Sequence, residues 1–499
     1  MDTGALDVVI VGAGLSGISA AYHVQTRLPG KSYAILEARE DLGGTWDIFR
    51  YPGIRSDSDM YTLGYSFRPW TEPKAIADGP SILRYVRETA EAYGIDRRIR
   101  YRRRVERARW SSERGRWEIE ARDAATGELA RMTARFLFVC AGYYDYGAGY
   151  APDFPGREDY RGRVVHPQSW TPDVDYDGKR VIVIGSGATA VTLVPELAKR
   201  AAHVTMLQRS PTYIVSMPAE DPIAGWMRRR LSSTAAYSVT RWKNVIFGMG
   251  FYGFCRRAPG VAKRLLVHQM KRRAGRTVDA ATHLTPAYDP WDQRLCLVPD
   301  GDLFDALRRG SAEIVTDHVA SFTERGIRLR SGRELDADLV VTATGLQLKF
   351  LGGMQLEVDG ARVEAPRHMV YKGAMLSDVP NFAFAIGYTN ASWTLKCDLT
   401  SEYVCRLLRH MDDNGYVSAA PQRNDPSLEE EPLIDFSSGY VRRALGAMPK
   451  QGSRAPWKLH QNYALDLALF RHGRLADGAM TFQRRRPADA TRAARRRSD

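Results

Sequence analysis

Asp7-Val-Val-Ile-Val-Gly-Ala-Gly-Leu-Ser-Gly17 decides the fold, because it joins a short apolar run to the pattern Gly12-x-Gly14-x-x-Gly17. The run is rich in β-branched residues and is followed by helical spacing, so it predicts a buried parallel strand, a tight turn and a helix. Gly14 lets a pyrophosphate approach the backbone, and Gly17 lets the helix pack closely on the strand. The helix N-terminus then offers free N–H groups to the phosphates. The stretch therefore predicts a dinucleotide-binding unit.

An acidic residue ends the next apolar run. Tyr33-Ala-Ile-Leu-Glu37 has the character of a second strand, and Glu37 stands 20 residues after Gly17. An acid at this position accepts a hydrogen bond from a ribose 2′-hydroxyl and repels a 2′-phosphate. Strand, helix, second strand and acid together favour a bound dinucleotide without a 2′-phosphate over the alternative of a glycine turn without a ligand.

The same pattern recurs later in the chain. Arg180-Val-Ile-Val-Ile-Gly185-Ser-Gly187-Ala-Thr-Ala190 again reads as strand, turn and helix, with Ala190 in the place of the third glycine. The second strand of this unit, 203–208, is followed by Arg209 and Ser210 instead of an acid. An arginine there holds a 2′-phosphate with paired donors, so the second unit predicts NADPH. The fold class is therefore α/β, with two Rossmann-like dinucleotide-binding domains, one for FAD and one for NADPH, and a helical insertion in the second.

The 499 residues exceed one ordinary hydrophobic core. We expect the first part of the FAD domain at 1–145, the NADPH domain at 146–345 with its insertion at about 221–282, the completion of the FAD domain at 346–483, and a disordered basic tail at 484–499. No run of about 18 apolar residues predicts a membrane-spanning helix. Five scattered cysteines without Cys-x-x-Cys spacing argue against a disulfide framework, a zinc site and a flavin-disulfide reductase. We expect a cytoplasmic protein.

The predicted insertion carries most of the charge asymmetry. No acid lies between Asp221 and Asp279, whereas that interval holds 13 lysines and arginines. One interpretation is a solvated basic insertion that lines a substrate entrance. The other is a surface that attracts anionic lipid headgroups at the inner face of the cell membrane, with Trp226, Trp242, Phe247, Phe251 and Phe254 as apolar partners. Nucleic acid is disfavoured because no known binding module accompanies the charge.

Three further stretches are candidates for a functional site. The long loop 43–57 follows the first nucleotide unit, and its Trp46 and Tyr51 suit packing on an aromatic ring system. Arg294 stands between apolar residues in a Pro-rich aromatic stretch, where an arginine is either paired structurally or offered to a negative species. His166 lies in a linker-like stretch, and a lone histidine there is more often structural than catalytic.

These stretches resemble the class B flavoprotein monooxygenases, and among them the Baeyer–Villiger monooxygenases. Two fingerprints carry the resemblance. Their matching residues are Gly43, Gly44, Trp46, Tyr51, Pro52, Gly53 and Asp57 in the loop and Gly162, His166 and Trp170 in the linker. Tyr160 and Thr171 depart from the linker fingerprint.

The resemblance implies a role for each matching position. FAD would be contacted by Gly12, Gly14, Ser16, Gly17, Glu37, Thr45, Trp46, Asp47, Ile48, Asp57 and Val105. NADPH would be contacted by Arg55, Ser56, Gly185, Ser186, Gly187, Ala188, Thr189, Ala190, Val191, Arg209 and Ser210. Arg294 would be the catalytic arginine, and Asp57 would orient it.

The resemblance also implies the reaction. NADPH would reduce FAD, O2 would form a C4a-peroxyflavin, and this species would convert a ketone to an ester while Arg294 stabilises the oxyanion. Thioethers and thioamides would take the oxygen to give S-oxides. Two alternatives stay open: an N- or S-oxygenating flavin monooxygenase without ketone activity, and a non-catalytic redox sensor at the membrane surface. The expected partners are a small ketone or sulfur-containing substrate and O2, without a metal.

Overall fold

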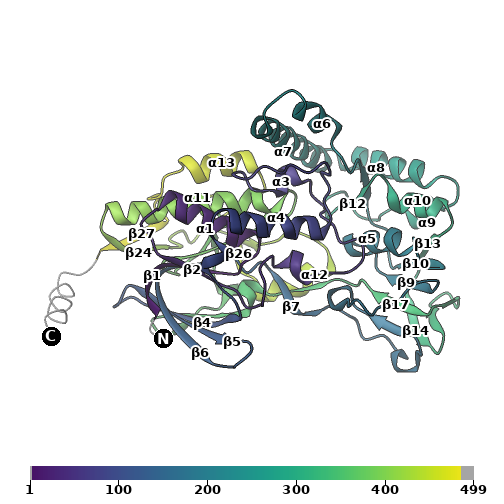
Figure 1. The fold of residues 1–499 in the computed structure, drawn as a ribbon, viewed down its shortest axis with the longest axis horizontal. Helices are drawn as coiled ribbons and strands as arrows, with labels where there is room; N and C mark the ends of the chain where they lie inside the picture. The colour runs from purple at the N-terminus through teal and green to yellow at the C-terminus, as the bar shows by residue number, and fades with distance from the viewer. Residues whose placement is uncertain (1–2, 485–499) are drawn as a thin grey trace.

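A computed structural model describes residues 3–484, and it shows a mixed α/β protein built on two sheets (Figure 1). Each sheet contains parallel strands of the dinucleotide-binding type, and the larger sheet also has the antiparallel pairs β4–β5, β5–β6 and β19–β20. We expect disorder in the tail 484–499, and this tail lies outside the described residues except for residue 484. The larger sheet has the strand order β20-β19-β4-β5-β6-β1-β2-β3, with β23 paired to β6. Its strands are β1 (Thr3–Val11), β2 (Tyr33–Leu36), β3 (Ile99–Arg100), β4 (Arg103–Ser111), β5 (Arg116–Asp123), β6 (Leu129–Val139), β19 (Gln355–Val358), β20 (Ala361–Arg362) and β23 (Phe382–Phe384).

The opening stretch folds as its pattern predicts. β1 runs parallel to β2 in the register Val8↔Tyr33 and parallel to β6 on its other side. The glycine turn leads directly into α1 (Leu15–Arg27), whose buried face packs against the long helix α11 (Trp393–Asp413). The dipeptide Asp359-Gly360 predicts a hairpin from the sequence, and this is also confirmed, since β19 and β20 pair antiparallel across it.

The smaller sheet has the order β13-β10-β9-β17-β8, and all its strand pairs are parallel. The second glycine motif joins β9 to α5 (Ala188–Leu197), which confirms the recurrence of the unit. The strands are β8 (Arg163–Val165), β9 (Arg180–Ile184), β10 (His203–Gln208), β13 (Ala312–Thr316) and β17 (Leu339–Thr342).

The structure differs from the sequence-based prediction at two elements. In the sequence, the stretch from Ile99 to Trp110 reads as a single strand. This prediction is wrong, because Arg102 turns the chain at a φ of +58°. β3 therefore pairs with β2, whereas β4 pairs antiparallel with β5. The stretch from Asp398 to Met411 reads as a helix in the sequence, but the helix begins five residues earlier, at Trp393. Asp398 therefore lies inside α11, where it is buried and accepts a hydrogen bond of 2.5 Å from the Ser19 hydroxyl.

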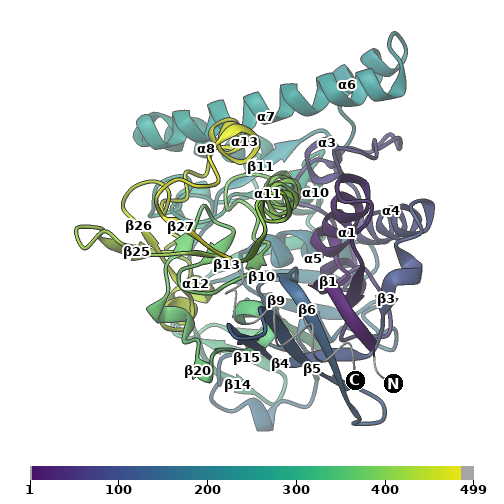
Figure 2. The same ribbon diagram turned by 90° about the vertical axis from the view of Figure 1, so that its left-hand side faces the viewer.

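The basic segment forms α6 (Pro222–Arg228), α7 (Ser233–Arg257), α8 (Pro259–Ala274) and α9 (Ala280–His283). Figures 1 and 2 show α6 and α7 along one outer edge of the molecule. α7 packs on the short helix α3 (Met60–Leu63), where the buried Arg241 guanidinium donates hydrogen bonds of 2.8 Å to the carbonyls of Tyr61 and Gly64. Within residues 3–484, no helix combines the length and apolarity that a membrane span requires.

Short elements complete the molecule. Helices α2 (Thr45–Ile48), α4 (Gly79–Ala92), α10 (Asp302–Arg308), α12 (Gly439–Ala444) and α13 (Tyr463–His472) accompany these sheets. The remaining strands are β7 (Tyr144–Gly149), β11 (Ile214–Met217), β12 (Cys296–Pro299), β14 (Val319–Thr323), β15 (Gly326–Leu329), β16 (Glu334–Asp336), β18 (Leu346–Leu348), β21 (Val370–Tyr371), β22 (Met375–Leu376), β24 (Tyr416–Pro421), β25 (Glu430–Pro432), β26 (Lys450–Gly452) and β27 (Met480–Arg484).

Candidate functional site

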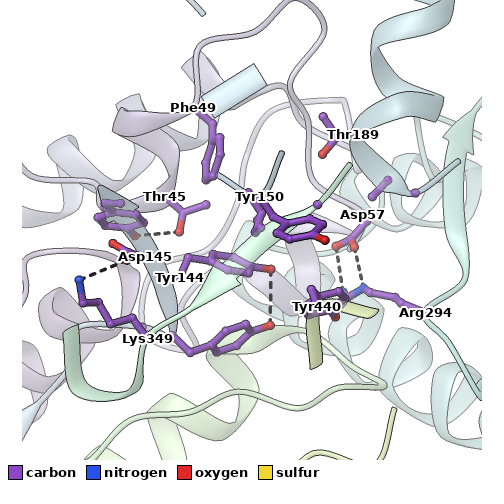
Figure 3. Close-up of a pocket in the computed structure, with 18 of the residues that line it drawn as sticks. Thr45, Phe49, Asp57, Tyr144, Asp145, Tyr150, Thr189, Arg294, Lys349 and Tyr440 are labelled. Carbon is purple, nitrogen blue, oxygen red and sulfur yellow. Dashed lines mark hydrogen bonds and ion pairs between the residues drawn. The ribbon is translucent and has the colours of Figure 1, made fainter. Parts of the chain in front are cut away.

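One cavity of about 1220 Å³ is lined by both glycine turns. It is also lined by the loop that precedes α3, by the stretch before β12, and by β7 (Figure 3). The two dinucleotide-binding patterns, which lie more than 150 residues apart in the chain, therefore open into a shared space.

The first turn presents donors and an acid to this cavity. Gly14 precedes α1, whose N-terminus has no side-chain cap and no acid in its first turn, so its free N–H groups and positive dipole suit a pyrophosphate. The buried Glu37 carboxylate accepts hydrogen bonds from the backbone N–H groups of Ala13 at 2.7 Å and Arg39 at 2.9 Å. Burial raises the pKa of Glu37, and the backbone hydrogen bonds oppose that shift. The carboxylate is thus held rigidly where a ribose hydroxyl would meet it.

The second turn is built similarly but carries the opposite charge. α5 begins after Gly187, again without a side-chain cap or an acid in its first turn. The Ser186 hydroxyl donates a hydrogen bond of 3.1 Å to the Ser210 carbonyl, which fixes the end of β10 beside the turn. Arg209 lines the cavity, is exposed, and has no ion-pair partner among residues 3–484. Its guanidinium is available to an anionic group.

Arg294 and Asp57 form a paired fork at the cavity wall. The Arg294 Nε lies 2.7 Å from Asp57 Oδ2, and the Arg294 terminal nitrogen lies 2.9 Å from Asp57 Oδ1. Both side chains are about one-third exposed, so the pair faces the cavity. Burial by itself lowers the pKa of Arg294, but the Asp57 carboxylate and neighbouring tyrosines outweigh it and raise the pKa above its usual value. Arg294 is therefore a permanent cation with a fixed orientation.

Three tyrosines surround this pair, and sequence analysis missed them. Tyr143 and Tyr144 have hydroxyls 3.5 Å apart, and Tyr440 lies on the same side of the cavity as Arg294 in Figure 3. Burial raises the pKa of all three hydroxyls, so they stay neutral near pH 7 and act as hydrogen-bond donors. The one signal in the sequence was that Tyr143 directly follows Ala141-Gly142, at the end of a buried strand. Tyr440 offered no signal, because only tertiary folding brings α12 to this wall.

Most of the predicted site residues line the cavity. Those that do are Gly12, Gly14, Ser16, Glu37, Thr45, Trp46, Arg55, Ser56, Asp57, Val105, Gly185, Ser186, Gly187, Ala188, Thr189, Arg209, Ser210 and Arg294. Those that do not are Gly17, Asp47, Ile48, Ala190 and Val191.

Two of the predicted polar residues are engaged within the protein. The buried Asp47 carboxylate accepts hydrogen bonds from Arg39 at 2.6 Å and Arg50 at 3.1 Å. Arg55 lines the cavity, but its guanidinium binds the Asp302 carboxylate at 2.5 and 3.3 Å. Contact with a nucleotide through Arg55 would therefore use the faces of the guanidinium that Asp302 leaves free.

His166 holds two segments together. Its Nδ1 accepts a hydrogen bond from the Gln168 N–H, so Nε2 carries the proton and donates to the Gly345 carbonyl at 3.2 Å. Burial lowers the pKa of His166. Gly345 follows β17, and the bond therefore ties the linker to the end of the smaller sheet.

Comparisons with known proteins agree on one group. The family model "Flavin-binding monooxygenase-like" matches residues 5–233. The chain is 55% identical over 481 residues to the "FAD-containing monooxygenase EthA" of Mycobacterium tuberculosis, covering 96% of this chain and 98% of that protein. It is 52% identical to the EthA of Mycolicibacterium smegmatis, covering 97% and 98%.

Solved structures share the fold at lower sequence identity. An oxidized steroid monooxygenase bound to NADP aligns with a TM-score of 0.74 at 24% identity, over 97% of this chain and all of the other. The structure of OTEMO in complex with FAD and NADP aligns with a TM-score of 0.70 at 24% identity, over 84% and 88% of the two chains. At this level of identity the likeness concerns the fold alone.

Proposed function

Since this chain belongs to the flavin-binding monooxygenase-like family, we propose that it uses FAD, NADPH and O2 to convert ketones into esters, and that it also oxygenates thioethers and thioamides. The overall reaction combines a ketone, O2, NADPH and a proton to give an ester, NADP⁺ and water. The observation that carries the proposal is the Arg294–Asp57 fork in the one cavity that both glycine turns share.

The residues of the two turns suit the two nucleotides. When bound, FAD supplies the electron transfer and oxygen activation that amino-acid side chains cannot. The N-terminus of α1 would bind the FAD pyrophosphate, and the Glu37 carboxylate would accept a ribose hydroxyl. The N-terminus of α5 would bind the NADPH pyrophosphate, and Arg209 would pair with the 2′-phosphate. NADPH and FAD would then meet within the shared cavity.

Arg294 supplies the charge that the oxygen chemistry needs. Attack on a ketone carbonyl places negative charge on the carbonyl oxygen, and a preorganised cation stabilises this charge without reorganising at the moment of reaction. Asp57 holds the guanidinium by two parallel hydrogen bonds, which restrict both its position and its plane. Tyr143, Tyr144 and Tyr440 line this wall, and their neutral hydroxyls can donate to a substrate oxygen.

The test compares Arg294→Ala with the wild type. We expect the variant to bind both nucleotides and to let NADPH bleach the flavin colour, because neither glycine turn is altered. Ester formation should fall by about 10²- to 10³-fold, the usual loss when one preorganised oxyanion donor is removed. Product analysis of ketone turnover and stopped-flow measurement of flavin reduction separate the two steps.

Arg256→Ala is a matched control. It removes another arginine–aspartate pair, in which Arg256 lies 3.1 Å from Asp292. Asp292 is two residues from Arg294 in the chain, but neither member of the pair lines the cavity. Normal ester formation by Arg294→Ala would contradict the role of Arg294. A wild type that oxygenates a thioether but no ketone would favour the N- or S-oxygenating alternative. NADPH consumption that no substrate stimulates would favour the redox sensor.

A further inference from the structure

Helix α7 has a buried inner face and an outer apolar stripe that stays largely exposed. The inner face carries the buried Tyr237, whose hydroxyl donates a hydrogen bond of 2.9 Å to the Tyr65 carbonyl, and the buried Arg241. The outer stripe, at positions spaced by three and four residues, is Val239, Trp242 and Ile246, which are 45%, 43% and 65% exposed. Trp242 also contacts the Tyr463 ring at a centroid distance of 5.7 Å, but more than two-fifths of each side chain in the stripe stays exposed.

The exposed apolar surface continues beyond α7. The described chain exposes 14 large apolar side chains, and ten of them lie within 222–278, which is about a ninth of the sequence. They include Trp226 on α6, Phe247 on α7 and Leu265 on α8, while Leu465 on α13 adds to the surface where Tyr463 contacts Trp242. We call these residues and the outer face of α6–α8 the ridge. Figures 1 and 2 both place α6 and α7 at the same outer edge of the molecule.

The ridge also carries unbalanced positive charge. Of the 13 lysines and arginines between Asp221 and Asp279, only Arg241, Lys243 and Arg256 lie within ion-pair distance of a carboxylate among residues 3–484. The other ten have no such partner in that part of the chain. An occupant of the ridge must therefore accept bulky apolar groups and many cations together.

We propose that the ridge docks on the surface of an anionic lipid bilayer, with α7 lying in the membrane plane. Apolar side chains would enter the boundary between headgroups and acyl chains, and the cations would meet lipid phosphates. A second copy of this chain would bring like charges together across a two-fold contact. Nucleic acid would satisfy the cations but would leave the valine, isoleucine and leucine side chains in water. The bilayer surface alone matches both properties.

The inner contacts of α7 make this surface rigid. Arg241 holds the carbonyls at the end of α3, and the Asn244 amide donates a hydrogen bond of 2.9 Å to the Asp59 carboxylate. The ridge is thus presented as a preformed face, so binding requires no refolding of the segment. This geometry would orient the whole molecule on the membrane.

Vesicle flotation of the purified full chain tests the proposal. The wild type should float with vesicles of phosphatidylcholine and phosphatidylglycerol, and should float far less with phosphatidylcholine alone. The double variant Ile246→Ser with Phe247→Ser should lower the partition coefficient by about tenfold or more, since it removes two inserted apolar groups. Arg229→Glu with Arg230→Glu should lower it comparably at low salt, and added salt should weaken wild-type binding.

Two matched controls lie on the β5–β6 hairpin, away from the ridge. Leu129→Ser removes an apolar side chain that is 39% exposed, and Arg116→Glu reverses an exposed charge; neither should change flotation. Circular dichroism and thermal unfolding confirm that each variant is folded. The proposal is overturned if the wild type ignores anionic vesicles, or if the ridge variants float as it does. Concentration-dependent dimers that Phe247→Ser abolishes, without vesicle binding, would instead identify the ridge as a self-association surface.

Discussion

The two glycine turns share one pattern but differ in how the protein surrounds them. A Cβ placed on Gly14 would meet the backbone of Gly44 at 3.7 Å, because the loop before α2 covers the first turn. A Cβ placed on Gly187 would meet nothing within 4 Å. Glu37 is buried beside the first turn, whereas Arg209 is exposed beside the second.

This contrast predicts that the two sites hold their ligands for different lengths of time. A covered turn with a buried, hydrogen-bonded acid is preorganised, and preorganised sites release a ligand slowly. An open turn with an exposed cation admits a ligand and lets it leave. The difference suits a resident FAD and an exchanging NADPH, as the proposed reaction, which would consume one NADPH per cycle, would require.

The largest expected effect comes from a substitution in the first glycine turn, which we call the closed turn because the loop before α2 covers it. In Gly17→Ala the new Cβ would lie 1.8 Å from the carbonyl oxygen of Gly12, which belongs to the turn between β1 and α1. We expect a loss of about 3 kcal/mol or more in the free energy of unfolding, together with loss of bound flavin. Gly187→Ala in the open turn should leave stability unchanged, since its φ of −79° suits alanine. Thermal unfolding and flavin absorbance measure both, and equal stabilities for the two variants would refute the tighter packing of the first turn.

The next effect concerns the acid of the closed turn. Glu37→Gln keeps the shape but removes the charge, and it leaves only one carbonyl oxygen to accept from Ala13 or Arg39. FAD affinity should fall by about ten- to a hundredfold, the usual range for a hydrogen bond to a charged group. Titration of FAD into the apoprotein measures the loss. Glu40→Gln, at an exposed neighbouring acid paired with Arg102, should bind FAD normally. If the two variants bound FAD equally, Glu37 would not be the ribose ligand.

Local patterns made both turns predictable from the sequence. Strand, glycine turn and helix are encoded within about 20 consecutive residues, so the two units and the Asp359-Gly360 hairpin appear where they are expected. The acid and the arginine that distinguish the two units follow their strands directly, so their positions beside the turns were also predictable. The split between β3 and β4 was not, because it depends on a single arginine in the left-handed region.

The rest of the site depends on contacts between distant segments. Asp57 and Arg294 are 237 residues apart in the chain. From the residues alone, a structural ion pair and a functional cation were equally good interpretations of Arg294. Tyr440 comes from a helix with no motif. Arg241 was counted among solvated cations, whereas the structure buries it against the carbonyls of α3. Periodicity and spacing report on neighbours in the chain, and these contacts are set by packing of the two sheets.

The smallest effect falls on the open turn and tests its selectivity. Arg209 is exposed, so solvent screens its charge, and Arg209→Ala should reduce the preference for NADPH over NADH by only about tenfold. The 2′-phosphate is remote from the transferred hydride, so KM for NADPH should rise while kcat at saturation stays constant. Arg209→Lys should retain part of the preference, because a lysine keeps the charge but loses the paired donors.

Steady-state kinetics with both coenzymes measures the change. Arg200→Ala is the matched control, because Arg200 is an exposed arginine of the same unit that pairs with Asp177. The Arg209 variants should leave FAD affinity untouched, because the closed turn is unaltered. If the coenzyme preference survived in Arg209→Ala, the exposed cation would not discriminate between coenzymes, and the opposition between an acid at one turn and an arginine at the other would no longer explain which nucleotide binds where.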